Sequence, residues 1–131
     1  MTSSQKRVLL VEDNADNRFI YSAMLRHAGY EVILASDGHE GLELGRTRSP
    51  HLVLMDISLP GLDGLEVTRL LKADEATRRT PIIALTAHAL PADRGRALDA
   101  GCDAYLSKPI APPAVLAEVR RLIGPATDTP A

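Results

Sequence analysis

The chain has 131 residues, of which 45% are hydrophobic and 24% charged, proportions typical of one folded domain rather than a disordered segment. Its formal net charge of -2 provides no basic excess for binding nucleic acid. The single cysteine, Cys102, can form neither an internal disulfide nor a multi-cysteine zinc site, which fits a reducing compartment. The apolar run at residues 8–11 is too short for a signal or membrane-spanning segment, so we expect a cytoplasmic domain without nucleic-acid or membrane partners.

Short apolar runs alternate with segments of helical length along the chain. The runs predict five strands, at residues 8–11, 32–35, 52–55, 82–85 and 104–106. The intervening and following segments predict five helices, at residues 16–28, 38–48, 64–73, 92–100 and 113–123. The first four runs are rich in Val, Ile and Leu without polar alternation, as expected of strands covered on both faces.

Helical periodicity and glycines refine the predicted helices. In the first helix, the helical spacing predicts a stripe formed by Ile20, Ala23, Met24 and Ala28. The second and fourth helices are weaker predictions because three glycines lower their helix propensity, namely Gly41, Gly45 and Gly95. Three other glycines stand where a left-handed cap would end a helix, namely Gly29, Gly101 and Gly124.

The alternation of strands and helices predicts an α/β fold: a three-layer α/β/α sandwich of the doubly wound kind, with a five-stranded parallel sheet and right-handed crossovers. We expect residues 1–124 to form the single domain. Residues 125–131 are rich in Pro, Thr and Ala and are predicted to form a short flexible tail.

Polar side chains follow four of the predicted strands. They are Glu12 and Asp13 after the first strand, Asp56 after the third, Thr86 after the fourth and Lys108 after the fifth. In open parallel sheets, functional groups collect at the carboxyl ends of the strands. If the strand order is 2-1-3-4-5, the three carboxylates converge on one small pocket.

Three convergent carboxylates repel one another, and a bound cation relieves that repulsion. Oxygen ligands without histidine or cysteine suit a hard ion, and an incomplete protein shell favours Mg²⁺ over Ca²⁺. A carboxylate nucleophile, a metal, the Thr86 hydroxyl and the Lys108 ammonium suffice for phosphoryl transfer onto an aspartate. No glycine-rich phosphate loop is present, so we expect the phosphoryl group to arrive on a donor rather than on a bound nucleotide.

Four motifs together resemble the receiver domain of two-component response regulators, the family with the flavodoxin-like fold of the chemotaxis regulator CheY. They are VLLVEDN at residues 8–14, LMD at 54–56 with LPGLDG at 59–64, IALTA at 83–87 and AYLSKP at 104–109. The resemblance extends over residues 6–123. It implies the strand order 2-1-3-4-5 with five helices.

The resemblance also implies a role for each site residue. Asp56 would accept the phosphoryl group, and Mg²⁺ would bind to Glu12, Asp13, Asp56 and the backbone carbonyl of Ser58. The backbone amides of Ile57 and Ala87 would face the phosphate, whereas Thr86, Lys108 and the switch aromatic Tyr105 would respond to it. A cis bond between Lys108 and Pro109 would direct the lysine into the pocket.

Asn14 with Asn17 and Arg18 is similar to receivers of hybrid kinases, phosphorelays and single-domain regulators, including cell-division regulators of the DivK type. The resemblance implies a phosphohistidine donor on a histidine kinase, a histidine phosphotransfer protein, or both. It also implies a downstream protein that binds the face formed by the fourth helix, fifth strand and fifth helix. We therefore expect a signalling module rather than an enzyme, present either as a stand-alone receiver or as part of a longer protein.

Three other functions are compatible with parts of the pattern. A haloacid-dehalogenase-type hydrolase needs a second aspartate at position 58, where this chain has Ser58. A flavin or nucleotide carrier needs a phosphate loop after the first strand, and an inert receiver would lack some of the site groups.

Two further hypotheses concern residues near the site. Ser58 and His88 flank the expected water path and would set the phosphate lifetime. Phe19 and Ile20 would dock a partner. Core packing is the competing role for Ile20.

Overall fold

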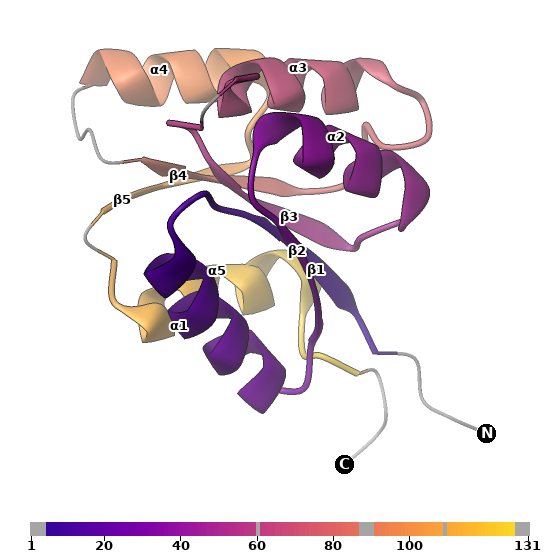
Figure 1. The fold of residues 1–131 in the computed structure, drawn as a ribbon, viewed down its shortest axis with the longest axis vertical. Helices are drawn as coiled ribbons and strands as arrows, with labels where there is room; N and C mark the ends of the chain where they lie inside the picture. The colour runs from indigo at the N-terminus through magenta and orange to yellow at the C-terminus, as the bar shows by residue number, and fades with distance from the viewer. Residues whose placement is uncertain (1–4, 60, 87–90, 109, 128–131) are drawn as a thin grey trace.

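The computed structural model describes residues 5–59, 61–86, 91–108 and 110–127. Strands and helices alternate along the chain (Figure 1): β1 (Arg7–Val11), α1 (Ala15–His27), β2 (Glu31–Ala35), α2 (Gly38–Thr47), β3 (Leu52–Asp56), α3 (Gly64–Ala73), β4 (Ile82–Thr86), α4 (Pro91–Ala100), β5 (Ala104–Ser107) and α5 (Pro112–Ile123). Each predicted element is present, and no boundary differs from its predicted position by more than one residue. Within the described part of the chain, no helix has the length and apolar character needed to cross a membrane.

The strands form one parallel sheet in the order β2-β1-β3-β4-β5, which confirms the predicted topology. β1 pairs with β2 from Arg7 opposite Glu31 and with β3 from Val8 opposite Leu52. β3 and β5 both pair with β4. Because all strands point the same way, their carboxyl ends meet at one edge, where β1 lies beside β3.

The helices cover both faces of the sheet, α1 and α5 on one and α2, α3 and α4 on the other (Figure 1). Alternate side chains of β1 supply the two cores: Val8 and Leu10 pack in the core beside α1 and α5, whereas Leu9 packs beside α2 and α3. Every residue of β3 and β4 is buried, as the apolar runs predict. The three-layer α/β/α sandwich is thus confirmed.

The buried face of α1 matches the predicted stripe in part, since Met24 and Ala28 pack against the core as predicted. Tyr21 and Leu25 are buried, whereas Ile20 is 47% exposed and Ala23 is also exposed. Apolar residues occur on several sides of this helix, so periodicity alone does not identify its inner face. The packing against β1 and α5 selects Tyr21 and Leu25, and the competing core role expected for Ile20 is wrong.

Glycines in α2 allow that helix to approach β1 and α3 closely. A Cβ atom at position 41 would lie 2.9 Å from a Val11 methyl group, and one at position 45 would lie 3.0 Å from Leu71. The same glycines that make α2 a weak prediction from propensity therefore serve its packing.

The start of the expected flexible tail is packed. Ala126 is 6% exposed, and its carbonyl accepts a hydrogen bond of 2.8 Å from the Lys6 amide. The Tyr30 hydroxyl donates to the Gly124 carbonyl at 2.5 Å. These contacts hold the chain around Ala126 against the amino-terminal end of the sheet, so the start of the predicted tail is packed.

Candidate functional site

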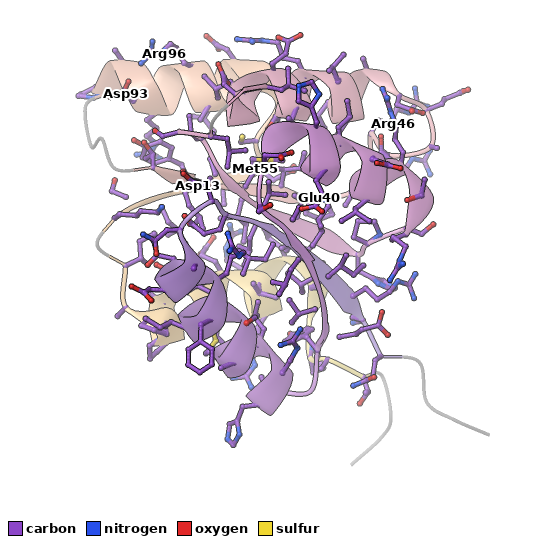
Figure 2. All side chains as sticks on the ribbon, viewed as in Figure 1. Asp13, Glu40, Arg46, Met55, Asp93 and Arg96 are labelled. Atoms are coloured by element: carbon purple, nitrogen blue, oxygen red, sulfur yellow. The ribbon has the colours of Figure 1, made fainter. Side chains whose placement is uncertain are left out.

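The polar residues singled out in the sequence meet at the carboxyl edge of the sheet. Glu12 and Asp13 follow β1, Asp56 and Thr86 are the last residues of β3 and β4, and Lys108 follows β5. Figure 2 shows Asp13 where the chain passes from β1 to α1. Parallel pairing in the order β2-β1-β3-β4-β5 brings these strand ends together from distant parts of the sequence.

Three carboxylates form the acidic part of the site. One oxygen from each of Glu12, Asp13 and Asp56 lies within 4.8 Å of the others. Glu12 and Asp56 are 0% and 3% exposed, whereas Asp13 is exposed to solvent. The cluster is therefore open on the side of Asp13 and closed on the side of the sheet.

Lys108 supplies the positive charge of the site. Its Nζ lies 3.0 Å from Glu12 Oε2 and 3.3 Å from Asp56 Oδ2. Burial opposes the charged ammonium, but hydrogen bonds and attraction to Glu12 and Asp56 outweigh it and raise the pKa of Lys108. The lysine therefore stays charged at neutral pH, and one ammonium faces three carboxylates.

The Asp56 carboxyl group is held from two sides. Oδ1 accepts a 3.0 Å hydrogen bond from the Ser58 backbone amide, and Oδ2 accepts one from Lys108. Burial and the adjacent Glu12 raise the pKa of Asp56, an effect that Lys108 and the Ser58 amide oppose. Burial thus makes the ionised form costly in the absence of a further cation.

The Ile57 backbone amide, which was expected to face the phosphate, forms a hydrogen bond within the sheet. It donates a 2.9 Å hydrogen bond to the Leu85 carbonyl and so continues the β3–β4 ladder. The prediction that this amide faces the phosphate is therefore wrong, and the Ser58 amide takes the position beside the Asp56 carboxyl. Ala87, His88 and the Lys108–Pro109 bond involve positions outside the described residues.

Thr86 and Tyr105 line a cavity beside the acidic cluster. The cavity has a volume of about 280 Å³, and its walls also include Ser58, Leu59 and Arg96. Thr86 is 2% exposed, whereas Tyr105 is half-buried. Figure 2 shows Asp93 and Arg96 on α4; both residues line the cavity and form an ion pair with each other.

Two residues with structural effects on the site had no assigned role in the sequence. Gly64 packs so closely that a Cβ there would lie 2.3 Å from the Asp56 carbonyl oxygen. The Arg18 guanidinium donates hydrogen bonds to the carbonyl oxygens of Glu12 and Asp13. In the sequence, Arg18 was noted only as a feature of a receiver subtype. Every residue has a backbone carbonyl group, so the residue types at positions 12 and 13 do not indicate this contact.

The donor set fits a magnesium ion. The ligands that the site offers are carboxylate oxygens, and neither histidine nor cysteine lies in this cluster of described residues. With all groups ionised, one ammonium leaves two negative charges without compensation. The exposed position of Asp13 leaves one side of the cluster accessible from solvent.

Five parallel strands in this order, with helices on both faces, define a flavodoxin-like fold, and its carboxyl edge carries an acidic cluster and a lysine. Residues 8–120 match the response regulator receiver domain, so the chain belongs to that family. Members act in two-component and phosphorelay signalling. This family is distinct from the haloacid-dehalogenase-type hydrolases and the flavin carriers considered above.

The relatives include a DivK regulator and the receiver domain of a sensor histidine kinase. The chain is 44% identical over 121 residues to the polar-differentiation response regulator DivK of Brucella ovis, a match that covers 92% of this chain and 98% of that protein. It is 43% identical, with a TM-score of 0.85, to the receiver domain of the sensor histidine kinase PA1611 of Pseudomonas aeruginosa, covering 92% and 99% of the two chains. That crystal structure has a magnesium ion coordinated in its active site cleft. The chemotaxis protein CheY4 of Vibrio cholerae has a TM-score of 0.86 at 28% identity, covering 91% and 99%.

Proposed function

We propose that Asp56 is the phosphoacceptor of this receiver and takes its phosphoryl group from a phosphohistidine on a histidine kinase or a histidine phosphotransfer protein. The observation that supports this most directly is the position of Asp56, whose carboxyl group is shared between Lys108 and the Ser58 amide beside two further carboxylates. This arrangement holds a nucleophilic oxygen at the open edge of the sheet.

The transfer is a substitution at phosphorus. One Asp56 oxygen forms a bond to phosphorus while the bond between phosphorus and the donor histidine nitrogen breaks. The imidazole leaves as a neutral ring because its other nitrogen carries a proton, and an acyl phosphate remains on Asp56. Lys108, which already contacts Oδ2 of Asp56, supplies positive charge to the phosphate oxygens.

We assign Mg²⁺ to Glu12, Asp13 and Asp56, with the Ser58 backbone carbonyl as a further ligand. When bound, the ion would supply positive charge to the phosphoryl oxygens and to these carboxylates. The residues themselves provide the orientation: Glu12 is fixed by Lys108, and Asp56 by Lys108 and the Ser58 amide.

Phosphorylation adds a charge of about -1.5 to -2 at pH 7, which changes the electrostatic interactions of Lys108 and the hydrogen bonding of Thr86. Thr86 and Tyr105 share the wall of the cavity next to the site, so a shift of the threonine toward the phosphate would free space for the tyrosine ring. The surface of α4, β5 and α5 would change as a result, and a downstream protein would bind there. The phosphate thus biases a two-state equilibrium.

The donor protein would dock at the start of α1. Phe19 is 74% exposed and Ile20 47% exposed, only a few residues beyond Asp13. An apolar helix surface on the donor fits these two side chains.

We propose that the protein is a cytoplasmic signalling module that turns over no separate substrate. We also propose that Ser58 and His88 set the lifetime of the acyl phosphate.

The test uses the full chain, Mg²⁺ and a small acyl phosphate as the donor. We expect the protein to gain one phosphoryl group that hydroxylamine removes, because hydroxylamine cleaves acyl phosphates and not phosphate esters. Asp56→Asn should abolish the label, whereas Ser58→Ala should retain it. Labelling of Asp56→Asn at the wild-type rate would contradict the assignment.

A further inference from the structure

The turn that carries Glu12 and Asp13 is tied to α1 by one side chain. Nη1 of Arg18 donates to the Glu12 carbonyl oxygen at 2.8 Å and to the Asp13 carbonyl oxygen at 2.9 Å. The Arg18 backbone amide donates to the Asn14 carbonyl at 3.0 Å, as part of the first turn of the helix. Arg18 thus binds the two consecutive carbonyl groups that follow the end of β1, and its own backbone is fixed in α1.

The two carboxylates of this turn differ in how they are held. The Glu12 carboxylate accepts hydrogen bonds from Lys108 and from the Asn14 amide. The Asp13 carboxylate is exposed and has no hydrogen bond to any residue within the described ranges. The position of Asp13 therefore depends on its backbone, and Arg18 binds that backbone directly.

From this geometry we infer that Arg18 is a positioning residue for cation binding: it holds the main chain of residues 12 and 13 so that both carboxylates face the same ion as Asp56. The inference rests on the proposed function, because it concerns the proposed Mg²⁺ site. Arg18 acts through carbonyl oxygens and contacts none of the three carboxylates. A rigid main chain lowers the cost of ordering an exposed ligand when the ion binds.

Because Arg18 is positively charged, the direction in which its removal changes Mg²⁺ affinity tests the inference. A guanidinium and Mg²⁺ repel each other, so removing the arginine would strengthen cation binding if only its charge mattered. Removing it would weaken binding if the two hydrogen bonds fix the ligands. Partners that orient metal ligands typically contribute tenfold or more to metal affinity, which exceeds the effect of a screened repulsion.

Arg18→Met is the main variant, because methionine retains an unbranched apolar chain but no donor. Arg26→Met is the matched control: Arg26 is exposed in the last turn of the same helix, about 12 Å further along the axis, and its loss changes the net charge equally. The measurement is the Mg²⁺ affinity of the full chain by titration calorimetry. Labelling by a small acyl phosphate, measured against Mg²⁺ concentration, is the second readout.

We expect Arg18→Met to weaken Mg²⁺ binding about tenfold and Arg26→Met to leave it within about twofold. Arg18→Lys, which keeps the charge on a shorter chain, should fall between Arg18→Met and wild type. The labelling rate of Arg18→Met should approach the wild-type rate at saturating Mg²⁺ and fall below it at limiting Mg²⁺. A lower rate at saturation alone would assign Arg18 to another role and overturn the inference.

Unchanged or tighter Mg²⁺ binding by Arg18→Met would also overturn it, as would equal weakening by Arg26→Met. If Arg18→Met does not fold, Arg18→Lys decides: weaker binding supports the inference and wild-type binding contradicts it. Failure of the wild-type chain to bind Mg²⁺ would instead contradict the proposed metal site, so the two failures are distinguishable.

Discussion

Lys108 Nζ lies 3.0 Å from Glu12 Oε2 although the two residues are 96 positions apart in the chain. Glu12 is fully buried, and the Lys108 side chain is 20% exposed. The pair joins the end of β1 to the end of β5 across the edge where Asp56 lies between them. Loss of the single cationic partner of a buried carboxylate strongly destabilises the folded state.

We therefore expect Lys108→Met to destabilise the protein in the presence of a chelator. Loss of one partner leaves Glu12 buried without its counter-charge, and partial exposure of the lysine limits the cost to about 1–2 kcal/mol in the free energy of unfolding. Urea denaturation measures this effect. Arg121→Met is the control, since its ion pair with Glu118 is at the surface and its loss should leave the midpoint nearly unchanged. Equal midpoints for wild type and Lys108→Met would contradict the expectation.

Asp56→Asn should stabilise the protein at neutral pH when no divalent cation is present. Burial and Glu12 raise the pKa of Asp56 from its ordinary value of 3.8, so the folded state binds this proton more tightly than the unfolded state. The free energy of unfolding of wild type then falls as pH rises from 3.8 through the raised pKa. Thermal melts should show a gain of a few degrees for Asp56→Asn at pH 7, which disappears near pH 4. A lower melting temperature for Asp56→Asn than for wild type at pH 7 would show that the ionised Asp56 carboxylate does not destabilise the folded protein.

Mg²⁺ should raise the melting temperature of the wild-type chain, and chelation should reverse the effect, because a ligand that binds only the folded state stabilises it. Asp13→Ala should abolish most of this shift while the protein without metal stays as stable as wild type, since Asp13 is exposed and adds repulsion to the cluster. Asp16→Ala removes a neighbouring exposed carboxylate and serves as the control. A full Mg²⁺ shift in Asp13→Ala would remove Asp13 from the ligand set.

Two glycines provide an opposed pair of substitutions. Gly64→Ala would place a Cβ 2.3 Å from the Asp56 carbonyl oxygen, so we expect a loss of about 2–3 kcal/mol and weaker Mg²⁺ binding as β3 is displaced. Gly95→Ala lies inside α4, and apart from the neighbouring backbone of that helix no atom lies within 4 Å of the new Cβ, so we expect a gain of about 0.5–1 kcal/mol. Chemical denaturation of the two variants measures both values. Similar stability of the two variants would show that the backbone at Asp56 relaxes without cost.

Much of the fold could be predicted from the sequence because strand runs and helix stops are local signals. Gly29 and Gly101 have positive φ angles of 99° and 109°, as their predicted cap positions require. The inner face of α1 could not be predicted, since Ile20 and Tyr21 are adjacent and both apolar, and only packing against the sheet distinguishes them. The packing of Ala126 likewise depends on its contact with Lys6, 120 positions earlier, which composition does not show.

The site was predictable as far as side chains at strand ends define it. Glu12 and Asp56 converge as the strand order requires, and Lys108 reaches both. Backbone groups were not predictable in the same way. The Ile57 amide belongs to the sheet ladder and the Ser58 amide to the Asp56 carboxyl, a difference of one residue that depends on where β3 ends.

Asp56 is the residue that we expect to carry the phosphoryl group. Peptide mapping by mass spectrometry, after the full chain has reacted with a phosphohistidine donor protein in Mg²⁺, tests this most directly. We expect a hydroxylamine-sensitive phosphate on the peptide that contains Asp56 and at no other residue. A stable phosphate on Ser58 or Thr86, with Asp56 unmodified, would contradict it.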